Sequence, residues 1–348
     1  MKKYIYLLAA MCCLAACEKP IEFEIEETEP LVVVNSVMQA DSGFTARVTL
    51  SRFFLDETKF KVVNDATLAL TINGTPAGPA TFGNGRYTIA CSPQPGDTVH
   101  LDVSVPGKAP VSAGTRIPYK PQLSGLKLLS ERDVNYYDRE LTFSVVLQDR
   151  PSESVGYLLS ANMVDTIDFD TIVEPWIDYI YNGREYVPDT LGWDTIMPHQ
   201  EVRNYTLYLE SDDPLLSSGV GLDDIEDIFD FKAHSAKGGG ERKFMFLDDA
   251  ISGQKHEFLL KSSFFYYDYD YAFDEKSPDG GVHHRTLIVN VTALSRDLYL
   301  YMKTKEQSDD ALEIFTEPVQ IHCNVVGGIG ILGSMSAAEI KKNIDEKK

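Results

Sequence analysis

Thr67-Leu68-Ala69-Leu70-Thr71-Ile72-Asn73-Gly74 carries the clearest structural signal of this chain. Its first six residues are aliphatic or β-branched, a composition that fits the pleated surface of a strand. The Asn-Gly dipeptide that follows is a strong signal for a two-residue hairpin turn. The stretch therefore predicts a β-strand that ends in a hairpin.

Strand-like segments recur on both sides of this stretch at short, regular spacing, with Gly, Pro and Asp between them. They are Leu31–Val34, Phe44–Leu50, Arg86–Ala90 and Val99–Val105. Such spacing is typical of a β-sandwich. We expect residues 17–118 to form an N-terminal β-sandwich domain that begins with an acidic linker, in which Ile21–Glu26 alternates like a half-buried strand.

A second β-rich domain is expected over residues 119–348, after the proline-marked boundary Pro118-Tyr119-Lys120-Pro121. Its predicted strands are Leu141–Leu147, Gly156–Ala161, Tyr205–Leu209, Lys243–Phe246, Glu257–Lys261, Thr286–Thr292 and Val319–Val325. We expect a larger β-sandwich or a partly open barrel, and hence an all-β chain. Helical signals are few: Leu222–Phe231 fits one short helix, and Ser336-Ala337-Ala338-Glu339 is a capping-box pattern.

The N-terminal residues follow the order of a secretory signal. Lys2 and Lys3 precede an apolar run that closes with Leu14-Ala15-Ala16-Cys17. The run is shorter than the roughly 20 residues that a membrane-spanning helix needs, so it indicates a leader that is removed. The closing motif resembles a bacterial lipobox, which implies a signal peptide over residues 1–16 and acylation of Cys17. An ordinary secretory leader is the alternative.

The chain is strongly acidic. Its formal net charge is −21 over 348 residues, and it becomes −23 if Lys2 and Lys3 leave with the leader. Such a surface repels nucleic-acid phosphates and anionic lipid headgroups, so we expect no nucleic-acid partner and no membrane binding through a basic face. Attachment to the membrane is expected through the acyl chains on Cys17 alone.

Two cysteines, Cys91 and Cys323, remain once the leader is removed and Cys17 is acylated. They could pair in an oxidising compartment. Both lie in apolar, strand-like contexts, where a buried free cysteine behaves as a small hydrophobe. Free thiols are the favoured interpretation and a disulfide is the alternative.

Several short motifs match a known family in their order and spacing. They are Asn64-Asp65-Ala66 with Gly85-Arg86-Tyr87, Ser211–Leu216, Phe246–Asp249 with Gly253, and Glu317–Gly330. Together they resemble the Bacteroidetes lipoprotein family known as domain of unknown function (DUF) 4249 over nearly the whole mature chain, although Phe169–His199 departs from its pattern. The resemblance implies an outer-membrane or cell-surface lipoprotein with an N-terminal immunoglobulin-like or transthyretin-like sandwich. It also implies frequent association with TonB-dependent transporters, and no established activity.

The sequence around the motifs that resemble enzyme or cofactor sites lacks the other elements that such sites need. Gly328-Ile329-Gly330-Ile331-Leu332-Gly333 matches the dinucleotide fingerprint, but that site needs a crossover helix and a second parallel strand about 20 residues later, and only Ser334–Lys348 follow the motif. Glycines that permit a tight turn or close backbone packing are expected there instead. The chain has no G-x-S-x-G elbow. We expect no cofactor and no enzyme.

Metal sites are not expected either. The acidic residues of 223–230 lack the spacing and central glycine of an EF-hand and fit a solvated helix face. His283-His284 follows a turn signal without a zinc-binding pattern. These histidines are expected at the start of a strand, with one of them exposed.

Two aromatic segments are candidate binding surfaces. In Phe264–Tyr271 aromatic residues alternate with carboxylates, so Tyr267 and Tyr269 would share one face of a strand and suit the apolar face of a sugar. A strand whose tyrosines pack on the core is the alternative.

The second segment is an insertion punctuated by Gly and Pro, and its aromatic residues are Trp176, Tyr179, Tyr181, Tyr186 and Trp193. Because connections on a rigid sandwich commonly carry recognition, the insertion is the better candidate for a glycan or peptide ligand.

Five Asp-Thr-aliphatic tripeptides resemble the acceptor of the Bacteroidetes periplasmic O-glycosylation system. The candidate acceptors are Thr98, Thr166, Thr171, Thr190 and Thr195. Chance and β propensity are the alternative origin of so short a motif. An attached glycan would require an exposed site.

These features predict a lipoprotein of the cell outer membrane, lipid-anchored through Cys17 and displayed on the surface, with a periplasmic orientation as the alternative. We expect a binding or accessory component of a TonB-dependent uptake system. The competing hypothesis is a surface glycan hydrolase that uses paired carboxylates such as Asp268 or Asp270, near Tyr267 and Tyr269, with one carboxyl kept protonated by an apolar pocket.

Overall fold

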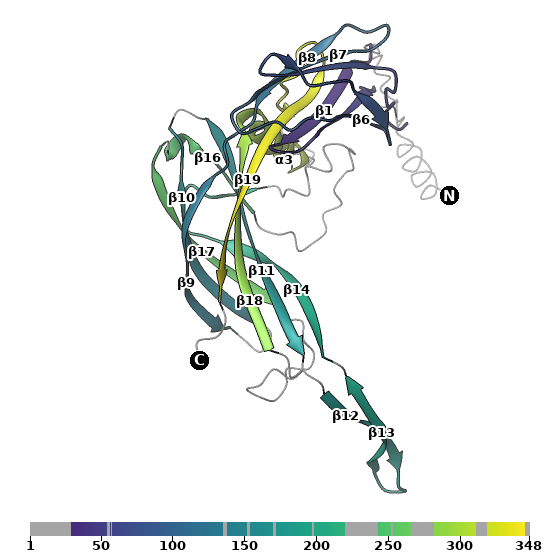
Figure 1. Ribbon diagram of the computed structural model, residues 1–348, viewed down its shortest axis with the longest axis vertical. Helices are drawn as coiled ribbons and strands as arrows, with labels where there is room; N and C mark the ends of the chain where they lie inside the picture. Colours follow the sequence, from purple (N-terminus) through teal and green to yellow (C-terminus); the bar gives the residue numbers. More distant parts are fainter. Residues whose placement is uncertain are drawn as a thin grey trace, which may run out of the picture. The chain divides into compact units, whose positions relative to one another are not determined.

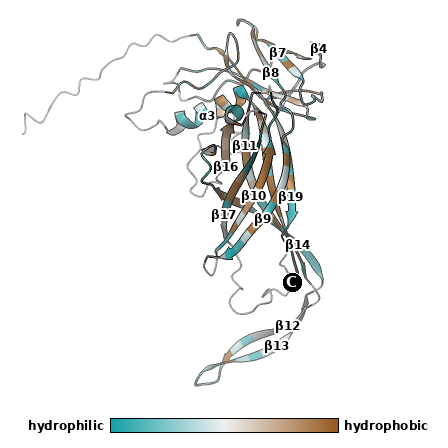
Figure 2. Cartoon of the chain, turned by 90° about the vertical axis from the view of Figure 1, so that its left-hand side faces the viewer, coloured by the Kyte–Doolittle hydropathy of each residue, from teal (hydrophilic) through white to brown (hydrophobic). Residues whose placement is uncertain are grey.

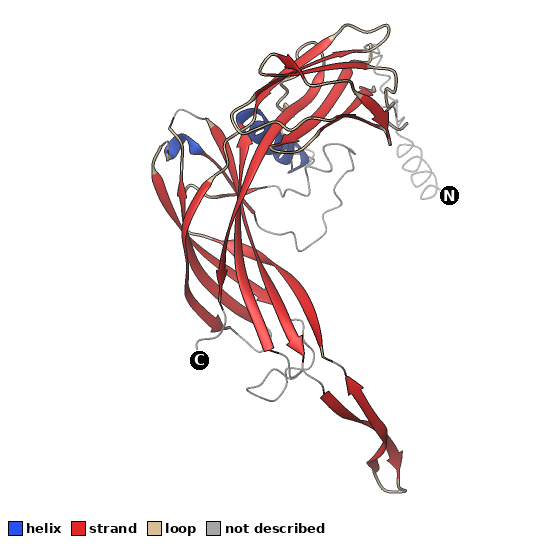
Figure 3. Ribbon diagram, viewed as in Figure 1, coloured by secondary structure: helices blue, strands red, loops and turns tan. Residues whose placement is uncertain are grey.

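The computed structural model describes residues 29–53, 56, 58–134, 138–151, 154–169, 172–196, 198–219, 243–251, 253–265, 282–310 and 319–344. The chain divides into a unit of Met1–Pro30 with Arg52–Lys59 and a larger unit of Leu31–Ser51 with Phe60–Lys348, which contains all the described strands. Strands predominate (Figure 3), and the described helices are α3 (Arg296–Asp310) and the 3-10 helix η1 (Asp248–Ala250). The predicted all-β, sandwich-type fold is confirmed.

Two sheets form the N-terminal β-sandwich. One contains β5 (Thr81–Gly83), β6 (Arg86–Ile89), β2 (Phe44–Leu50) and β1 (Val32–Gln39), and the other contains β4 (Thr75–Pro76), β3 (Thr67–Ile72), β7 (Thr98–Ser104) and β8 (Val111–Arg116). Buried and exposed residues alternate strictly along β7, as the period of a strand requires. The buried residues form one core, which includes Val34, Phe44, Val48, Leu70, Val99 and Leu101.

The Asn73-Gly74 turn is confirmed between β3 and β4, where Ile72 pairs with Thr75. Both turn residues have positive φ angles, 51° and 77°. This combination matches the right-handed twist of the flanking strands, and Asn and Gly adopt it at the lowest cost.

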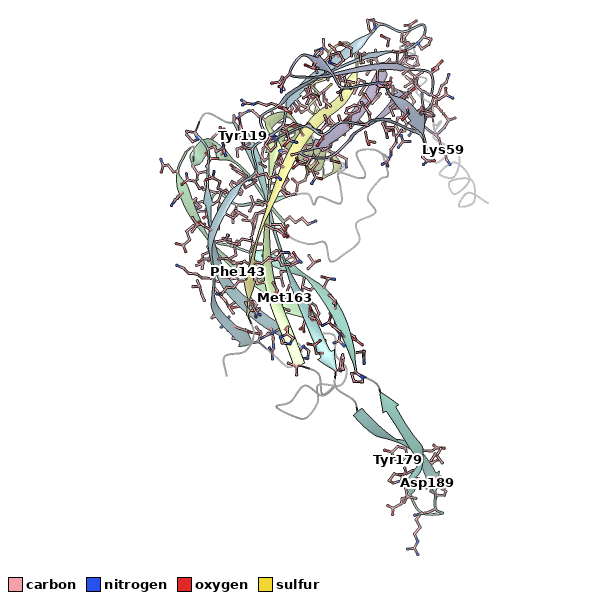
Figure 4. All side chains as sticks on the ribbon, viewed as in Figure 1. Lys59, Tyr119, Phe143, Met163, Tyr179 and Asp189 are labelled. Atoms are coloured by element: carbon pink, nitrogen blue, oxygen red, sulfur yellow. The ribbon has the colours of Figure 1, made fainter. Side chains whose placement is uncertain are left out.

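Most of the remaining strands line a second core, and Figure 1 shows how these strands lie beside one another. Hydrogen bonding joins them in the order β19 (Ile329–Asn343), β18 (Val282–Ser295), β11 (Val155–Phe169), β14 (His199–Glu210), β17 (Lys255–Phe265), β10 (Asp138–Gln148) and β9 (Gln122–Asp133). Near its start, at Gly156–Leu159, β11 pairs with β16 (Lys243–Leu247) in place of β14. In turn, β16 pairs with β15 (Ser217–Gly219). Figure 2 shows apolar residues along β10 and β11, and Figure 4 labels the fully buried Phe143 and Met163.

Strand β19 belongs to both cores. Its first half pairs in parallel with β1, from Val33↔Ile329 to Gln39↔Met335, and its second half pairs antiparallel with β18, from Leu294↔Met335 to Thr286↔Asn343. The division of domains at residue 118 stays a prediction, and Pro118 lies between β8 and β9. The strands on either side of that point nevertheless share β19.

The glycines of the 328–333 segment serve close backbone packing, as expected. Gly330 has a φ of 119°, and a Cβ built on it would overlap the backbone carbonyl oxygen of Val34. A residue with a side chain could not occupy this point of the β1–β19 ladder.

Two local predictions are wrong. Ser336–Glu339 is not a helix start but part of β19, where Ser336 pairs with Ala293, because long-range pairing overrides the local capping signal. Val319–Val325 is not a strand. Instead, His322 Nε2 lies 2.8 Å from Asp297 Oδ1 at the start of α3, and Asn324 accepts a hydrogen bond from the Leu332 backbone N–H at 2.9 Å. Side-chain bonds therefore hold this segment in place of a strand ladder.

The helix α3 was not predicted from sequence. Ser295 precedes it and accepts a hydrogen bond from the backbone N–H of Leu298 at 3.4 Å, as an N-cap residue does. Its buried face, which includes Leu298 and Met302, packs on Leu158 and Ile331. Among the described helices none is long and apolar enough to cross a membrane. The predicted segments Ile21–Glu26 and Leu222–Phe231 lie outside the described residues.

Candidate functional site: an aromatic hairpin

The insertion between β11 and β14 is a β-hairpin and not a loop. Its strands β12 (Ile172–Tyr181) and β13 (Tyr186–Ile196) form a two-stranded sheet of their own (Figure 1). Asn182 closes the turn, since its Oδ1 accepts hydrogen bonds from the backbone N–H groups of Arg184 and Glu185 at 3.0 and 3.1 Å. Gly183 supplies the positive φ angle of 94° that the turn needs.

Large side chains near the turn are exposed. The exposed fractions are 63% for Tyr179, 49% for Ile180, 56% for Tyr181 and 71% for Tyr186. The rings of Tyr181 and Tyr186 lie 5.3 Å apart, between centroids, across the two strands. Because these aromatic residues bury so little area within the chain, packing does not account for them.

The register of the hairpin separates two faces. Residues directly opposite each other share a face, so Tyr181 with Tyr186 and Tyr179 with Pro188 form an aromatic face. On the other face Asp178 lies opposite Asp189 and Ile180 lies opposite Val187. Both aspartates are exposed, and Figure 4 labels Asp189. Two like charges in directly opposed positions destabilise a strand pair. A hairpin with these two faces is poorly suited to stabilise itself and well suited to contact a partner.

The other predicted aromatic residues are only partly placed. Trp176 pairs with Gly192 and Trp193 pairs with Pro175 in the hairpin register, but their side chains lie outside the described residues. Tyr267, Tyr269, Asp268 and Asp270 lie wholly outside them. The strands flanking these last residues are placed: Val282, the first residue of β18, pairs with Asp168 near the end of β11, from which the hairpin follows.

The candidate glycosylation sites differ in accessibility. Thr98 on β7 and Thr190 on β13 are exposed, and Thr166 on β11 is half-buried. The side chains of Thr171 and Thr195 lie outside the described residues. Thr98 and Thr190 are therefore more accessible to glycosylation than Thr166.

A polar cluster missed by sequence reasoning lies beside the second core, and its members Asp165 and Arg285 are buried. Asp165 Oδ2 on β11 lies 2.7 Å from His283 Nδ1 on β18. Arg285 on β18 pairs with Glu131 on β9, which Arg139 also contacts at 3.0 Å. His284, the next residue along β18, is exposed, as expected for one of the two histidines. Across the described ranges no three His, Cys, Asp or Glu side chains gather so as to hold a metal ion.

Two more buried carboxylates organise the turn between β16 and β17. Asp149 accepts hydrogen bonds from the Tyr157 hydroxyl and the Gly253 backbone N–H, both at 2.7 Å. Asp248 accepts one from the Val155 backbone N–H at 3.2 Å. Burial raises the pKa of Asp248 to about 6 against the opposing effect of that N–H. The Phe246–Asp249 motif with Gly253 is therefore structural.

Both remaining cysteines are free, as the favoured interpretation predicted, but the expected burial of Cys323 in a strand is wrong. Cys91 is half-buried, and burial raises the pKa of its thiol. Cys323 is exposed in the segment that His322 and Asn324 hold.

The described chain is thus an all-β, sandwich-type protein that carries an exposed aromatic hairpin. It belongs to the family described as "Domain of unknown function (DUF4249)", whose model matches residues 18–341, so the resemblance found in the sequence is confirmed. No curated protein matches the chain. Among solved structures, a collagen adhesin from S. aureus aligns over 90% of this chain and 96% of its own, with 8% identity and a TM-score of 0.15, which is too low to support any inference.

Proposed function

We propose that this chain is a binding module and not an enzyme, that its acylated Cys17 anchors it to the outer membrane on the cell surface, and that it serves a TonB-dependent uptake system as an accessory component. The observation that carries the proposal is the hairpin, which exposes Tyr179, Ile180, Tyr181 and Tyr186. Tyrosine is enriched at protein interfaces because it combines a large apolar surface with a polar tip.

The energetics favour a partner on the hairpin. Each large apolar side chain gains about 1.5–3 kcal/mol when it passes from water to a buried site. An isolated two-stranded hairpin is only marginally stable in water, so its conformation gains most from contact with another surface. A partner that covers the aromatic face would bury the exposed side chains and would also stabilise the conformation of the hairpin.

The anchor supports a partner in the same membrane. Acyl chains on Cys17 would confine the protein to the surface where integral outer-membrane transporters lie. Labelling of growing cells with a fatty acid should mark the wild-type protein and leave Cys17→Ala unmarked. Equal labelling of both would contradict the anchor.

Affinity purification of the tagged, full-length protein from solubilised outer membranes tests the function. We expect a TonB-dependent transporter to be recovered with the wild type and lost with the combined Tyr179→Ala, Tyr181→Ala and Tyr186→Ala variant. Val202→Ala, which alters an exposed apolar residue of β14, is the matched control and should retain the transporter. Repeated recovery without any transporter would contradict the uptake role.

The hydrolase hypothesis finds no support among the described residues, because its carboxylates, Asp268 and Asp270, lie outside them. Incubation of the mature protein with polysaccharides separates the two functions. Binding without product supports the module. Release of reducing ends that is abolished by Asp268→Asn or Asp270→Asn would replace it with an enzyme.

A further inference from the structure

One edge of β17 is only partly paired. On one side β17 pairs with β10 over its whole length, from Gln148↔Lys255 to Asp138↔Phe265. On the other side it pairs with β14 at three positions only, which end at Glu210↔Lys261. From residue 255 to residue 260, this side of β17 has no partner among the described strands.

The segment Ser211–Leu216 runs beside this edge without pairing with it as a strand. Ser211 Oγ donates a hydrogen bond to the backbone carbonyl of Leu259 at 2.8 Å, and Asp213 Oδ2 lies 2.6 Å from His256 Nε2. The other carboxylate oxygen of Asp213 accepts the Leu215 backbone N–H at 3.0 Å. The segment is therefore fixed to β17 by side chains, and the strand's own backbone ladder is not continued.

A hollow of about 350 Å³ lies between this segment and β17, and its lining includes Asp212, Pro214, Glu257, Leu259 and Lys261. This volume falls within the range of about 300–1,000 Å³ that is usual for ligand sites. Backbone groups of alternate strand residues point to the same side. Since the Leu259 carbonyl accepts the hydrogen bond from Ser211, the backbone N–H and C=O groups of Glu257 lie on the same edge of β17, and Glu257 lines the hollow.

The hollow carries an excess of negative charge. The Asp213 carboxylate is hydrogen-bonded to the His256 imidazole, and Lys261 Nζ lies 3.9 Å from Asp212 Oδ2. The exposed carboxylate of Glu257 has no ion-pair partner in the described part of the chain. Leu259 adds an apolar surface, because half of its side chain is exposed.

We propose that this hollow binds an extended peptide that carries a lysine or arginine. The peptide adds as a short strand to the edge of β17, where the backbone of Glu257 supplies the hydrogen bonds of strand addition. Its basic side chain pairs with the Glu257 carboxylate, and a neighbouring apolar side chain packs on Leu259 and Pro214. This site is independent of the hairpin and of the function proposed for it.

Fluorescence anisotropy of labelled heptapeptides with the purified mature protein tests the proposal. The probes are acetyl-STVKVTS-amide, the same peptide with Glu in place of Lys, and a version of the Lys peptide with N-methylated backbone amides. We expect the Lys peptide to bind at least about tenfold tighter than either of the others, since both a charged hydrogen bond and a strand ladder are lost in them.

Variants of the protein locate the site. Glu257→Gln should weaken binding of the Lys peptide and Glu257→Lys should abolish it, whereas Asp102→Lys, a charge reversal at an exposed residue of β7, should leave it unchanged. Equal binding by wild type and both Glu257 variants would overturn the site. Equal binding of the N-methylated peptide would overturn strand addition. Thermal unfolding monitored by circular dichroism verifies that each variant is folded.

Discussion

His283 Nδ1 lies 2.7 Å from Oδ2 of Asp165, a residue with no exposed surface. The two residues come from adjacent strands, β18 and β11, which pair from Val155↔Ser295 to Asp168↔Val282. A buried carboxylate without such a partner costs the free energy of its desolvation. The second core of this protein therefore depends on a polar contact in its interior.

His283→Ala should lower the free energy of unfolding by about 1–3 kcal/mol, because it removes a hydrogen bond to a buried carboxyl group. Urea denaturation followed by circular dichroism measures the loss. His284→Ala, at the exposed neighbouring position, is the control and should change the stability by less than about 0.5 kcal/mol. Equal effects of the two substitutions would show that the contact with Asp165 has no special weight.

Asp248 should make the stability pH-dependent. Its pKa is raised from 3.8 to about 6 in the folded chain, so the folded state binds more protons than the unfolded state between these values. The contribution of Asp248 to the free energy of unfolding should fall as the pH rises from 4 to 6, by at most about 3 kcal/mol and by less to the extent that solvent screens the carboxyl. Asp248→Asn should be more stable than the wild type at pH 7 and should lose this part of the slope. An unchanged slope in urea denaturation at several pH values would contradict the assignment.

Gly330→Ala should destabilise the junction of β1 and β19 by well over about 1 kcal/mol, because a Cβ there overlaps the Val34 carbonyl. Gly83→Ala is the matched control, since Gly83 also lies in a strand but has no heavy atom within 4 Å of the added Cβ. Thermal unfolding compares the two. A Gly330→Ala protein as stable as the control would mean that β1 and β19 do not approach so closely in solution.

Much of the N-terminal sandwich could be predicted because its signals are local. The segments Phe44–Leu50 and Thr67–Ile72 coincide with β2 and β3, and Asn73-Gly74 forms the turn expected of it. The pairing of β1 with β19 joins residues almost 300 positions apart, such as Val33 and Ile329, and no local pattern indicates such a pairing.

The insertion could be predicted as a distinct segment rich in aromatic residues but not as a pair of strands, and its binding role stays a prediction. Pro175, Pro188 and Gly192 interrupt the β pattern of this insertion, and each weakens a central strand. A two-stranded sheet has two open edges, which tolerate residues that cannot donate to a ladder. Tyr179 and Tyr186 are exposed because β12 and β13 form a separate sheet, and the spacing of aromatic residues in the sequence does not predict this.

Loss of single tryptophans should weaken partner binding while the fold persists. Trp176→Ala or Trp193→Ala should reduce the binding free energy by about 1 kcal/mol or more, with a nearly unchanged melting temperature, if these residues extend the aromatic surface. Co-purification yields and thermal unfolding supply the two readouts. A large fall in melting temperature with unchanged recovery would assign both residues to packing.

Site-specific photo-crosslinking in intact cells tests the recognition role of the hairpin most directly. A photoreactive phenylalanine at Tyr186, the most exposed of the hairpin tyrosines, should crosslink to an outer-membrane transporter, whereas the same group at Val202 should not. Crosslinking to a transporter from Val202 but not from Tyr186 or Tyr179 would contradict the claim that the hairpin contacts the partner.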